Sequence, residues 1–412
     1  MLRGMARPTL TLAALATAAV SGLEITSAQR HSRGSHGDYD AVDLQSADGR
    51  RLLVRVPNSV SAETEQSADL VALRALTTGV RGRLDFRVPT YIGQVPFSGT
   101  RAIVSDLIPG DVYSADELTR DADVADAVGR AIAAIHSLPT AFVGEAGLPQ
   151  ASAADSRTAA LALIGRAADT GRLPAALVRR WENATDDDAL WQFPALVING
   201  GLSADSFLIE GDRVSGVIGW AGLAVGDPAK DLHWLLGARG ANAEVALAAY
   251  TSARSGGIDR LIAQRALLYG ELELVKWLLH GIDARDSAIV DDAVSMLDGL
   301  VEGVHAEHVS PLSPETGPIM TVNDVERMLD RTPRESARRD PGAHLLTDSY
   351  DQSEFERYRE GEAAGPDADA TGPIALDLTG FGDSSAPSGT SEPDADTDAT
   401  TPDQDARNSD SS

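Results

Sequence analysis

The stretch VINGGLSADSFLIEGDRVSGVIGWAGLAVGDPAKDLHW, residues 197–234, decides the fold of this chain. Two apolar runs, residues 206–209 and 214–218, flank the turn sequence EGDR at 210–213, a pattern that predicts a β-hairpin. A loop rich in Gly and Ser precedes the hairpin, and the turn sequence GDP at 226–228 follows it. We therefore expect a loop, a hairpin and a tight turn in direct succession.

The order and spacing of this stretch resemble the catalytic core of the aminoglycoside and macrolide phosphotransferase-like family, which has the protein-kinase fold. That family runs roughly H-G-D-L-x-x-x-N, hairpin, V-I-D-W, G-D-P and D-L. At the positions of its His, Gly, Asp, Leu and Asn, this chain has Asn199, Gly200, Gly201, Leu202 and Ser206. Gly219-Trp220 stands at Asp-Trp, whereas the GDP turn and Asp231 remain. The resemblance implies a kinase-like scaffold with a degenerate catalytic centre.

Three positions that carry the chemistry in the resembled family have no acidic or amide side chain here. In phosphoryl transfer an Asp orients the attacking hydroxyl, and an Asn and a second Asp hold the Mg²⁺ ions that bridge the phosphates. Gly201 and Gly219 offer no side-chain ligand, and the Ser206 hydroxyl is a weak, neutral one. We therefore expect no catalytic residue and no metal site. Asp205 is the one alternative metal ligand, and it is equally read as a helix cap or solvated loop residue.

A nucleotide site is implied by the same resemblance, in the N-terminal part of the chain. Kinases of this fold hold the phosphates with a strand Lys that is paired with a helix Glu. The alternating residues 52–57 place Arg55 at the lysine position, and Asp69, in the predicted helix 68–76, lies near the glutamate position. Asp106 lies in the connector between the lobes. The resemblance assigns nucleotide binding to these three residues; for Arg55 and Asp69, an ordinary surface ion pair is the alternative.

Two acidic residues after the hairpin are expected to support structure. In the resembled fold an acid after the GDP turn accepts hydrogen bonds from backbone N–H groups of the catalytic loop, and buried donors need such partners with or without catalysis. Asp231 holds this position, and Asp227 belongs to the turn itself. Retention of both acids, without the loop acid, is typical of a scaffold kept for folding.

The resemblance implies an α+β, bilobal protein-kinase-like fold, and the composition predicts a disordered acidic C-terminal tail. We expect a β-rich N-terminal lobe over residues 8–107, a helical C-terminal lobe over 108–306 and a mostly disordered tail over 307–412. Strands are predicted at 39–44, 51–56, 88–92 and 101–105. Helices are predicted at 121–137, 174–183, 242–255, 259–280 and 284–304.

Composition narrows the function classes. A formal charge of −27 argues against binding to nucleic acid or to anionic membranes. The absence of Cys excludes disulfides, thiolate nucleophiles and Cys-based zinc sites. The eight His show no metal-binding spacing, and we expect His136, His233 and His280 to pack or cap helices.

The N-terminus has two interpretations. Basic residues before the apolar run 10–20, and the small residues Thr26-Ser27-Ala28 after it, are typical of a signal peptide. The helical spacing of Leu12 and Ala16 instead favours a packed helix, as in the proteins this chain resembles. The run is too short to span a membrane, and we expect a cytoplasmic protein.

Together these features predict a phosphotransferase-like pseudokinase that binds or scaffolds without catalysis. One alternative is an active ATP-dependent small-molecule phosphotransferase with rearranged acids, and another is an adaptor that works through its acidic tail. No cofactor is certain; ATP or GTP with Mg²⁺ is the candidate, and a small-molecule ligand is expected in the interlobe cleft. A protein partner is expected to dock through the segments 316–331 and 371–383.

Overall fold

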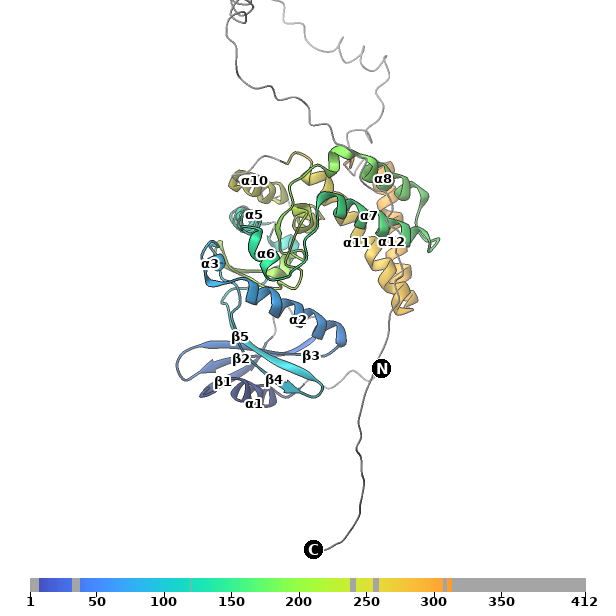
Figure 1. The fold of residues 1–412 in the computed structure, drawn as a ribbon. Helices are drawn as coiled ribbons and strands as arrows, with labels where there is room; N and C mark the ends of the chain where they lie inside the picture. Colours follow the sequence, from blue (N-terminus) through green and yellow to red (C-terminus); the bar gives the residue numbers. More distant parts are fainter. Residues whose placement is uncertain are drawn as a thin grey trace, which may run out of the picture. The chain divides into compact units, whose positions relative to one another are not determined.

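The computed structural model describes residues 7–31, 38–118, 120–237, 242–254, 259–306 and 310–312. The predicted tail segments 316–331 and 371–383 lie outside these residues. Within the described residues a β-sheet lobe is followed by a helical lobe, which confirms the predicted α+β, bilobal class (Figure 1). No helix in the described ranges is both long and apolar enough to cross a membrane.

A five-stranded antiparallel sheet forms the first lobe, in the spatial order β1-β2-β3-β5-β4. Its strands are β1 (Ile25–Arg30), β2 (Tyr39–Ser46), β3 (Arg51–Pro57), β4 (Tyr91–Phe97) and β5 (Thr100–Asp106). The two runs predicted at 39–44 and 51–56 pair as the hairpin β2–β3, with Leu44 opposite Leu52. Alternation along β3 sends Leu52 and Val54 to one face of the sheet and Arg55 to the other.

The helices α1 (Thr9–Ala19) and α2 (Val60–Ala75) lie on opposite faces of this sheet (Figure 1). Leu12 and Ala16 of α1 are buried with Val54 and Val104 in the core of the sheet lobe. In the described structure the N-terminal apolar run is therefore a packed helix, the second of its two interpretations. Helix α2 covers the face to which Arg55 points, and it carries Asp69.

The strand predicted at 88–92 was wrong in its bounds, because β4 begins only at Tyr91. The carbonyl groups of Val88 and Pro89 accept hydrogen bonds from the Arg81 guanidinium, at 2.7 and 3.0 Å, instead of joining the sheet. Pro96 lies inside β4, and it is tolerated there because β4 is an edge strand.

The second lobe is mainly helical. Its long helices are α5 (Ala122–His136), α7 (Ala153–Ala168), α8 (Ala175–Asp186), α10 (Ala243–Ala253), α11 (Ile262–Ala284) and α12 (Ser287–His305). Its short helices and turns are α4 (Ala115–Leu118), α6 (Ala141–Glu145), α9 (His233–Gly237), η1 (Asp188–Trp191), η2 (Ala204–Ser206) and η3 (Pro228–Asp231), and α3 (Thr78–Arg81) precedes β4. The helix predicted to start at residue 259 starts at Ile262, since the Asp259 carboxylate instead accepts the Leu261 N–H ahead of it.

The strands of the stretch 197–234 form two two-stranded antiparallel sheets. Strands β7 (Phe207–Glu210) and β8 (Arg213–Val217) form the predicted hairpin, and β6 (Leu196–Ile198) pairs with β9 (Ala224–Gly226). The loop 199–206 and the segment 218–223 therefore leave paired strands and lie close together.

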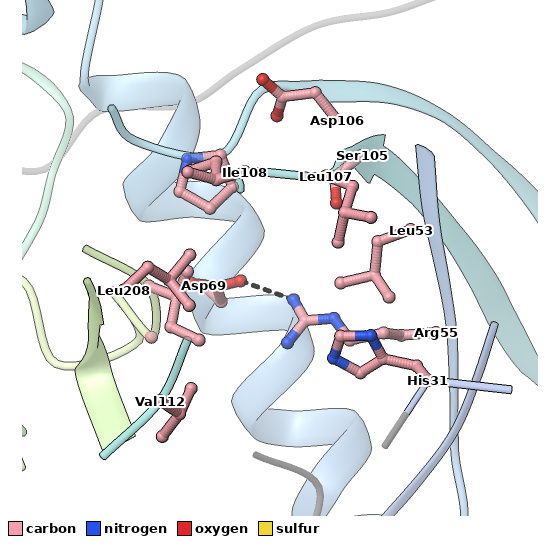
Figure 2. Close-up of a pocket in the computed structure, with 13 residues that line it drawn as sticks. His31, Leu53, Arg55, Asp69, Ser105, Asp106, Leu107, Ile108, Val112 and Leu208 are labelled. Carbon is pink, nitrogen blue, oxygen red and sulfur yellow. Dashed lines mark hydrogen bonds and ion pairs between the residues drawn. The ribbon is translucent and has the colours of Figure 1, made fainter. Parts of the chain in front are cut away.

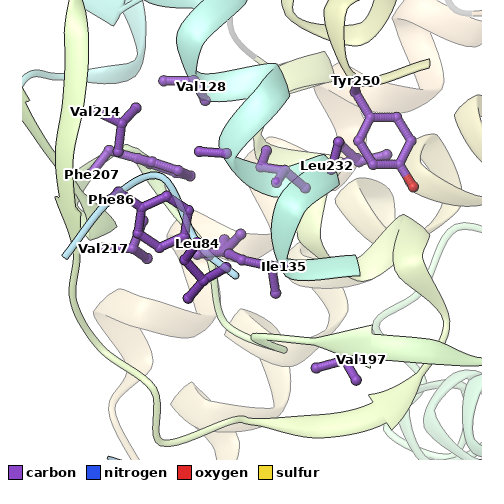
Figure 3. Close-up of a cluster of buried hydrophobic side chains, with 14 of the residues drawn as sticks. Leu84, Phe86, Val128, Ile135, Val197, Phe207, Val214, Val217, Leu232 and Tyr250 are labelled. Atoms are coloured by element: carbon purple, nitrogen blue, oxygen red, sulfur yellow. The ribbon is translucent and has the colours of Figure 1, made fainter. Parts of the chain in front are cut away.

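Apolar side chains from both lobes share one core. Leu84 and Phe86, which precede β4, are buried against Ile135 of α5 and Phe207 of β7 (Figure 3). A separate cluster joins α7, α8, α11 and α12, with Trp181 fully buried in it. The first cluster includes side chains of the strands on either side of loop 199–206. The second cluster holds α7, α8, α11 and α12 together.

Candidate functional site

Asp231 accepts hydrogen bonds from the backbone of the loop 199–206. Its carboxylate is fully buried and accepts the backbone N–H groups of Asn199, at 2.7 Å, and Gly200, at 2.8 Å. The Nε2 atom of buried His136 lies 3.1 Å from the same carboxylate, and its Nδ1 lies 3.0 Å from the Tyr250 hydroxyl. Since a carboxylate only accepts, Nε2 carries the hydrogen. Three segments distant in sequence, α5, the 199–200 loop and η3, thus meet at one carboxylate.

Asp227, in the GDP turn at 226–228, is a second buried acid with several hydrogen-bond donors around it. It is fully buried, caps η3 through the Ala229 N–H at 2.9 Å, and accepts from the Arg265 guanidinium at 2.8 Å and the Tyr269 hydroxyl at 3.0 Å. Burial, followed by the charge of Asp227, raises the pKa of Tyr269, so this phenol remains a donor. Asp227 is therefore enclosed by structural partners.

Arg265 lies within the helix predicted at 259–280, and sequence reasoning did not single it out. The side chain is fully buried, donates to the Leu190 carbonyl at 3.1 Å, pairs with Asp259 and lies 4.1 Å from the Phe193 ring centroid. An arginine at a core position of an apolar helix was the available signal, because such a charge needs a buried partner.

The three positions 201, 206 and 219, which carry no acidic or amide side chain, lie in one small region. Ser206 is buried, and its hydroxyl accepts the Ser203 N–H at 3.1 Å, which closes the η2 turn. Gly219 has a φ of 73°, and its carbonyl accepts the Asn199 side-chain amide at 3.0 Å. The Gly201 N–H donates to the other end of that amide, the Asn199 Oδ1, at 3.2 Å. Asn199, at the position of the family's His, thus links the loop to residue 219, a role that the sequence did not indicate.

A close approach of two backbones also shapes this region. A Cβ added to Gly200, whose φ is 79°, would lie 2.3 Å from the Gly222 carbonyl oxygen. The neighbouring position differs, because a Cβ at Gly201 would have its nearest heavy atom, Asn199 Oδ1, at 3.9 Å. At Gly219 no heavy atom would lie within 4 Å, although the positive φ favours glycine. Packing therefore demands glycine at 200 but leaves room for side chains at 201 and 219.

Asp205, the alternative metal ligand, is half-buried in the η2 turn. Across the described ranges, no three His, Cys, Asp or Glu side chains are close enough together to hold a metal ion. The donors present around Gly201, Ser206 and Gly219 do not fit Mg²⁺, which takes carboxylate oxygens in an octahedral set.

Arg55 and Asp69 form the predicted ion pair, at 3.0 Å. Their side chains are only 28% and 10% exposed, so the pair is not an ordinary surface pair. The second oxygen of Asp69 accepts the Trp220 backbone N–H at 2.8 Å. Arg55 also lies over the Tyr39 ring, 5.3 Å from its centroid. Asp69 therefore joins β3 of the sheet lobe to the segment that follows the degenerate position 219.

Asp106 contacts the polypeptide backbone and a neighbouring arginine. It accepts the Thr90 N–H and pairs with Arg87 at 3.4 Å. These contacts hold the segment that leads into β4, and the nucleotide-binding role that the resemblance implied for Asp106 stays a prediction.

The lobes enclose a cleft with an empty volume of about 570 Å³, open solvent included. Arg55 and His31 lie side by side in it, and Asp106 lies well away from them (Figure 2). Its apolar lining residues are Leu53, Leu107, Ile108, Val112, Leu208 and Ile218. His31, which the sequence did not suggest, is 2.6 Å from Asp43. Apolar walls with a few polar groups at the edge are typical of a small-molecule site.

A five-stranded sheet with α2 across one face, a hairpin-borne loop and an acid that braces it define the protein-kinase-like class of fold. The family comparison agrees: the chain belongs to the phosphotransferase enzyme family, APH, whose profile matches residues 32–268.

Known proteins similar to the chain are distant. The uncharacterized protein YcbJ of Bacillus subtilis is 25% identical over 215 residues, which cover 51% of this chain and 70% of YcbJ. The solved macrolide 2'-phosphotransferase MphH of Brachybacterium faecium superposes with a TM-score of 0.58 at 22% identity, over 70% of this chain and 98% of MphH. The GDP complex of wild-type aminoglycoside 2'-phosphotransferase-IIIa gives a TM-score of 0.58 at 18% identity, over 71% and 98% of the two chains. At such identities the structural likeness shows the fold alone.

Proposed function

We propose that this chain is a ligand-binding member of the phosphotransferase family without phosphoryl-transfer activity. One observation carries the proposal: the loop braced by Asp231 keeps its backbone bonds, while Gly201, Ser206 and Gly219 supply no acid to it. Catalysis of phosphoryl transfer depends almost entirely on positioning and on charge stabilisation by metal ions. With neither the loop acid nor a fitting metal donor set, the chemical step lacks its main stabilisation.

The interlobe cleft is the proposed ligand site, with ATP or GTP as the candidate ligand. Arg55 faces the cleft and is held in place by Asp69 and Tyr39, which lowers the entropy lost when a guanidinium meets a phosphate. Because arginine stays charged and needs no metal to bind phosphate, nucleotide binding should be independent of Mg²⁺.

Thermal unfolding of the full chain with ATP or GTP, with and without Mg²⁺, tests this proposal. A ligand that binds only the folded state raises the unfolding midpoint by mass action. We expect a rise that does not need Mg²⁺, that is absent in Arg55→Ala, and that is unaccompanied by phosphate release. A Mg²⁺-dependent rise with phosphate release would instead identify an active phosphotransferase, and the loss of that release in Asp205→Asn would identify the relocated acid. No rise with either nucleotide would refute the nucleotide site.

Restoring the missing groups gives a second test. A Cβ added at Gly201 has its nearest heavy atom at 3.9 Å, and one added at Gly219 meets no heavy atom within 4 Å, at a positive φ that Asp tolerates better than most residues. If the scaffold is intact, these two changes with Ser206→Asn should create Mg²⁺-dependent nucleotide hydrolysis that the unmodified chain lacks. Gly201→Ala with Gly219→Asn is the matched control, because it adds volume without adding a carboxylate.

Protein partners are proposed to bind outside the described residues, through 316–331 and 371–383. Removal of residues 313–412 should then abolish partner capture and leave nucleotide binding unchanged. Equal capture by both forms would refute this docking.

A further inference from the structure

A second hollow lies in the helical lobe, between α7, η3 and α11. Its empty volume is about 1080 Å³, open solvent included. Ala159 and Leu163 of α7 and Leu272 of α11 give it apolar walls, and Gly200 of the braced loop also lines it. We call this hollow the lysine groove, because Lys230 and Lys276 line it.

The chain contains 35 Lys and Arg, and its only two lysines are Lys230 and Lys276. Both line this groove, together with Arg166 and His233. The two lysines come from different elements, η3 and α11, so neither helical periodicity nor sequence proximity explains their meeting. The formal charge of the whole chain is −27, so a hollow lined by two lysines, an arginine and a histidine runs against its overall composition.

Lys230 is half-buried and makes no ion pair with any described residue. Its ammonium lies 5.6 Å from the centroid of the Tyr269 ring. The nearest acids are committed elsewhere: Asp227 to Arg265 and Tyr269, and Asp231 to the loop N–H groups. Burial lowers the pKa of Lys230, the negative charges of Asp227 and Asp231 act to raise it, and the like charge of Lys276 acts to lower it. A partly desolvated ammonium without a direct ion-pair partner gains a charge-assisted hydrogen bond when an anion binds.

Two neighbours complete the polar end of the groove. His233 Nδ1 donates to the Lys230 carbonyl oxygen at 2.7 Å, which holds the imidazole beside Lys230. Glu273 is the one acidic lining residue, and it pairs with Lys276 on the same face of α11. This pair is 43–56% exposed and can open at little cost.

We propose that the lysine groove binds a small organic anion, a carboxylate or a phosphate monoester carried on an apolar body. Lys230 and Lys276 hold the anionic group, and the Ala and Leu side chains of α7 and α11 cover the body. The site is separate from the interlobe cleft, since the two share no lining residue. Anion binding in the lysine groove therefore does not depend on nucleotide binding in the interlobe cleft.

The scarcity of lysine makes a direct test available on the unmodified full chain. Acylation by N-acetoxysuccinimide can modify only Lys230, Lys276 and the α-amino group, and peptide mass spectrometry reads each site separately. Phenyl phosphate and benzoate are the two anionic probes, and benzyl alcohol is the neutral one. We expect one or both anions, but not benzyl alcohol, to slow acylation of Lys230 several-fold while the α-amino group reacts at an unchanged rate.

Titration calorimetry with the protecting probe assigns the contact. Lys230→Met should weaken its affinity at least about tenfold, as expected for loss of a charged hydrogen bond, and Lys230→Arg should restore most of it. Arg55→Ala, in the other cleft, should bind the probe as the unmodified chain does. Protection by phenyl phosphate alone identifies a phosphate site, and protection by benzoate alone identifies a carboxylate site. Absence of protection by both anions, equal affinity in Lys230→Met, or loss of binding only in Arg55→Ala would overturn the proposal.

Discussion

At the scale of the residue, single buried acids determine the shape of the candidate site. Asp231 satisfies two backbone N–H groups and a histidine, and Asp227 satisfies a turn, an arginine and a tyrosine. Buried donors that lose an acceptor retain the full cost of their desolvation. Substitution at these positions should therefore act on stability before it acts on any ligand.

The first prediction concerns Asp231. Asp231→Ala should lower the free energy of unfolding by about 3 kcal/mol or more, because three donors lose their acceptor at a fully buried site. Urea denaturation followed by circular dichroism measures this loss. Asp212→Ala, in the exposed turn of the β7–β8 hairpin, is the control and should change stability by less than about 0.5 kcal/mol. Equal losses at both positions would contradict the bracing role.

The second prediction separates two adjacent glycines. Gly200→Ala should cost about 2 kcal/mol or more, since its Cβ meets the Gly222 carbonyl and its φ is positive. Gly201→Ala has no such contact and should be close to neutral. The unfolding midpoints of the two variants, measured by thermal denaturation, should differ accordingly. Similar midpoints would show that the backbones at Gly200 and Gly222 do not stay this close.

The third prediction concerns pH. Because the pKa of Lys230 is lowered in the folded chain, the unfolded chain binds more protons between the two pKa values. The contribution of Lys230 to stability therefore rises with pH across that alkaline window. The buried tyrosines Tyr250 and Tyr269, whose pKa values burial raises, act in the opposite direction. The stability of the unmodified chain minus that of Lys230→Met, measured by urea denaturation from pH 7 to 10.5, isolates lysine and should increase. A flat difference would show that Lys230 is not desolvated.

At the scale of the element, local patterns predicted most of the structure. Alternation predicted the β2–β3 and β7–β8 hairpins, and helical spacing predicted α5, α8, α10, α11 and α12. The start of β4 could not be predicted, since the side chain of Arg81, seven and eight residues earlier, donates to the carbonyls that precede it. The same limit applied to the site. The sequence indicated which positions lacked acids, but not that Asn199 links the loop to Gly219 or that both lysines share a groove.

A fourth prediction belongs to α7, the wall of the lysine groove. Ser152 and Asp155 form a capping box at its start, and hydrogen bonds from Ser152 lower the pKa of Asp155. Ser152→Ala should reduce stability by about 1 kcal/mol, through loss of a partner for a free N–H group. Thr158→Ala, exposed in the middle of α7, should be neutral or slightly stabilising because alanine favours helix. Chemical denaturation of both variants provides the comparison, and a loss in Thr158→Ala as large as in Ser152→Ala would argue against the cap.

At the scale of the whole molecule, one carboxylate joins the two lobes. Asp69 holds Arg55 of β3 with one oxygen and the Trp220 backbone with the other, across 151 residues of sequence. Loops closed over such distances cost chain entropy that local contacts do not recover. The geometry of the cleft therefore depends on a contact that no local sequence pattern contains.

The fifth prediction tests this link. Asp69→Ala should lower stability by about 2 kcal/mol and should abolish any nucleotide-induced rise in the unfolding midpoint, because Arg55 loses its support. Asp69→Asn keeps an acceptor for the Trp220 N–H and should recover part of the stability without recovering the nucleotide effect. Asp85→Ala, at an exposed site, is the control. Full nucleotide response in Asp69→Ala would contradict the link.

The bracing contact of Asp231 has a consequence for evolution. An acid that must accept buried backbone N–H groups is under selection for folding, whether or not the chain transfers phosphate. A gene can then lose its catalytic acids freely while purifying selection keeps this one. An aspartate at this position in a related protein therefore shows that the fold has been inherited. It does not show whether that protein transfers phosphate.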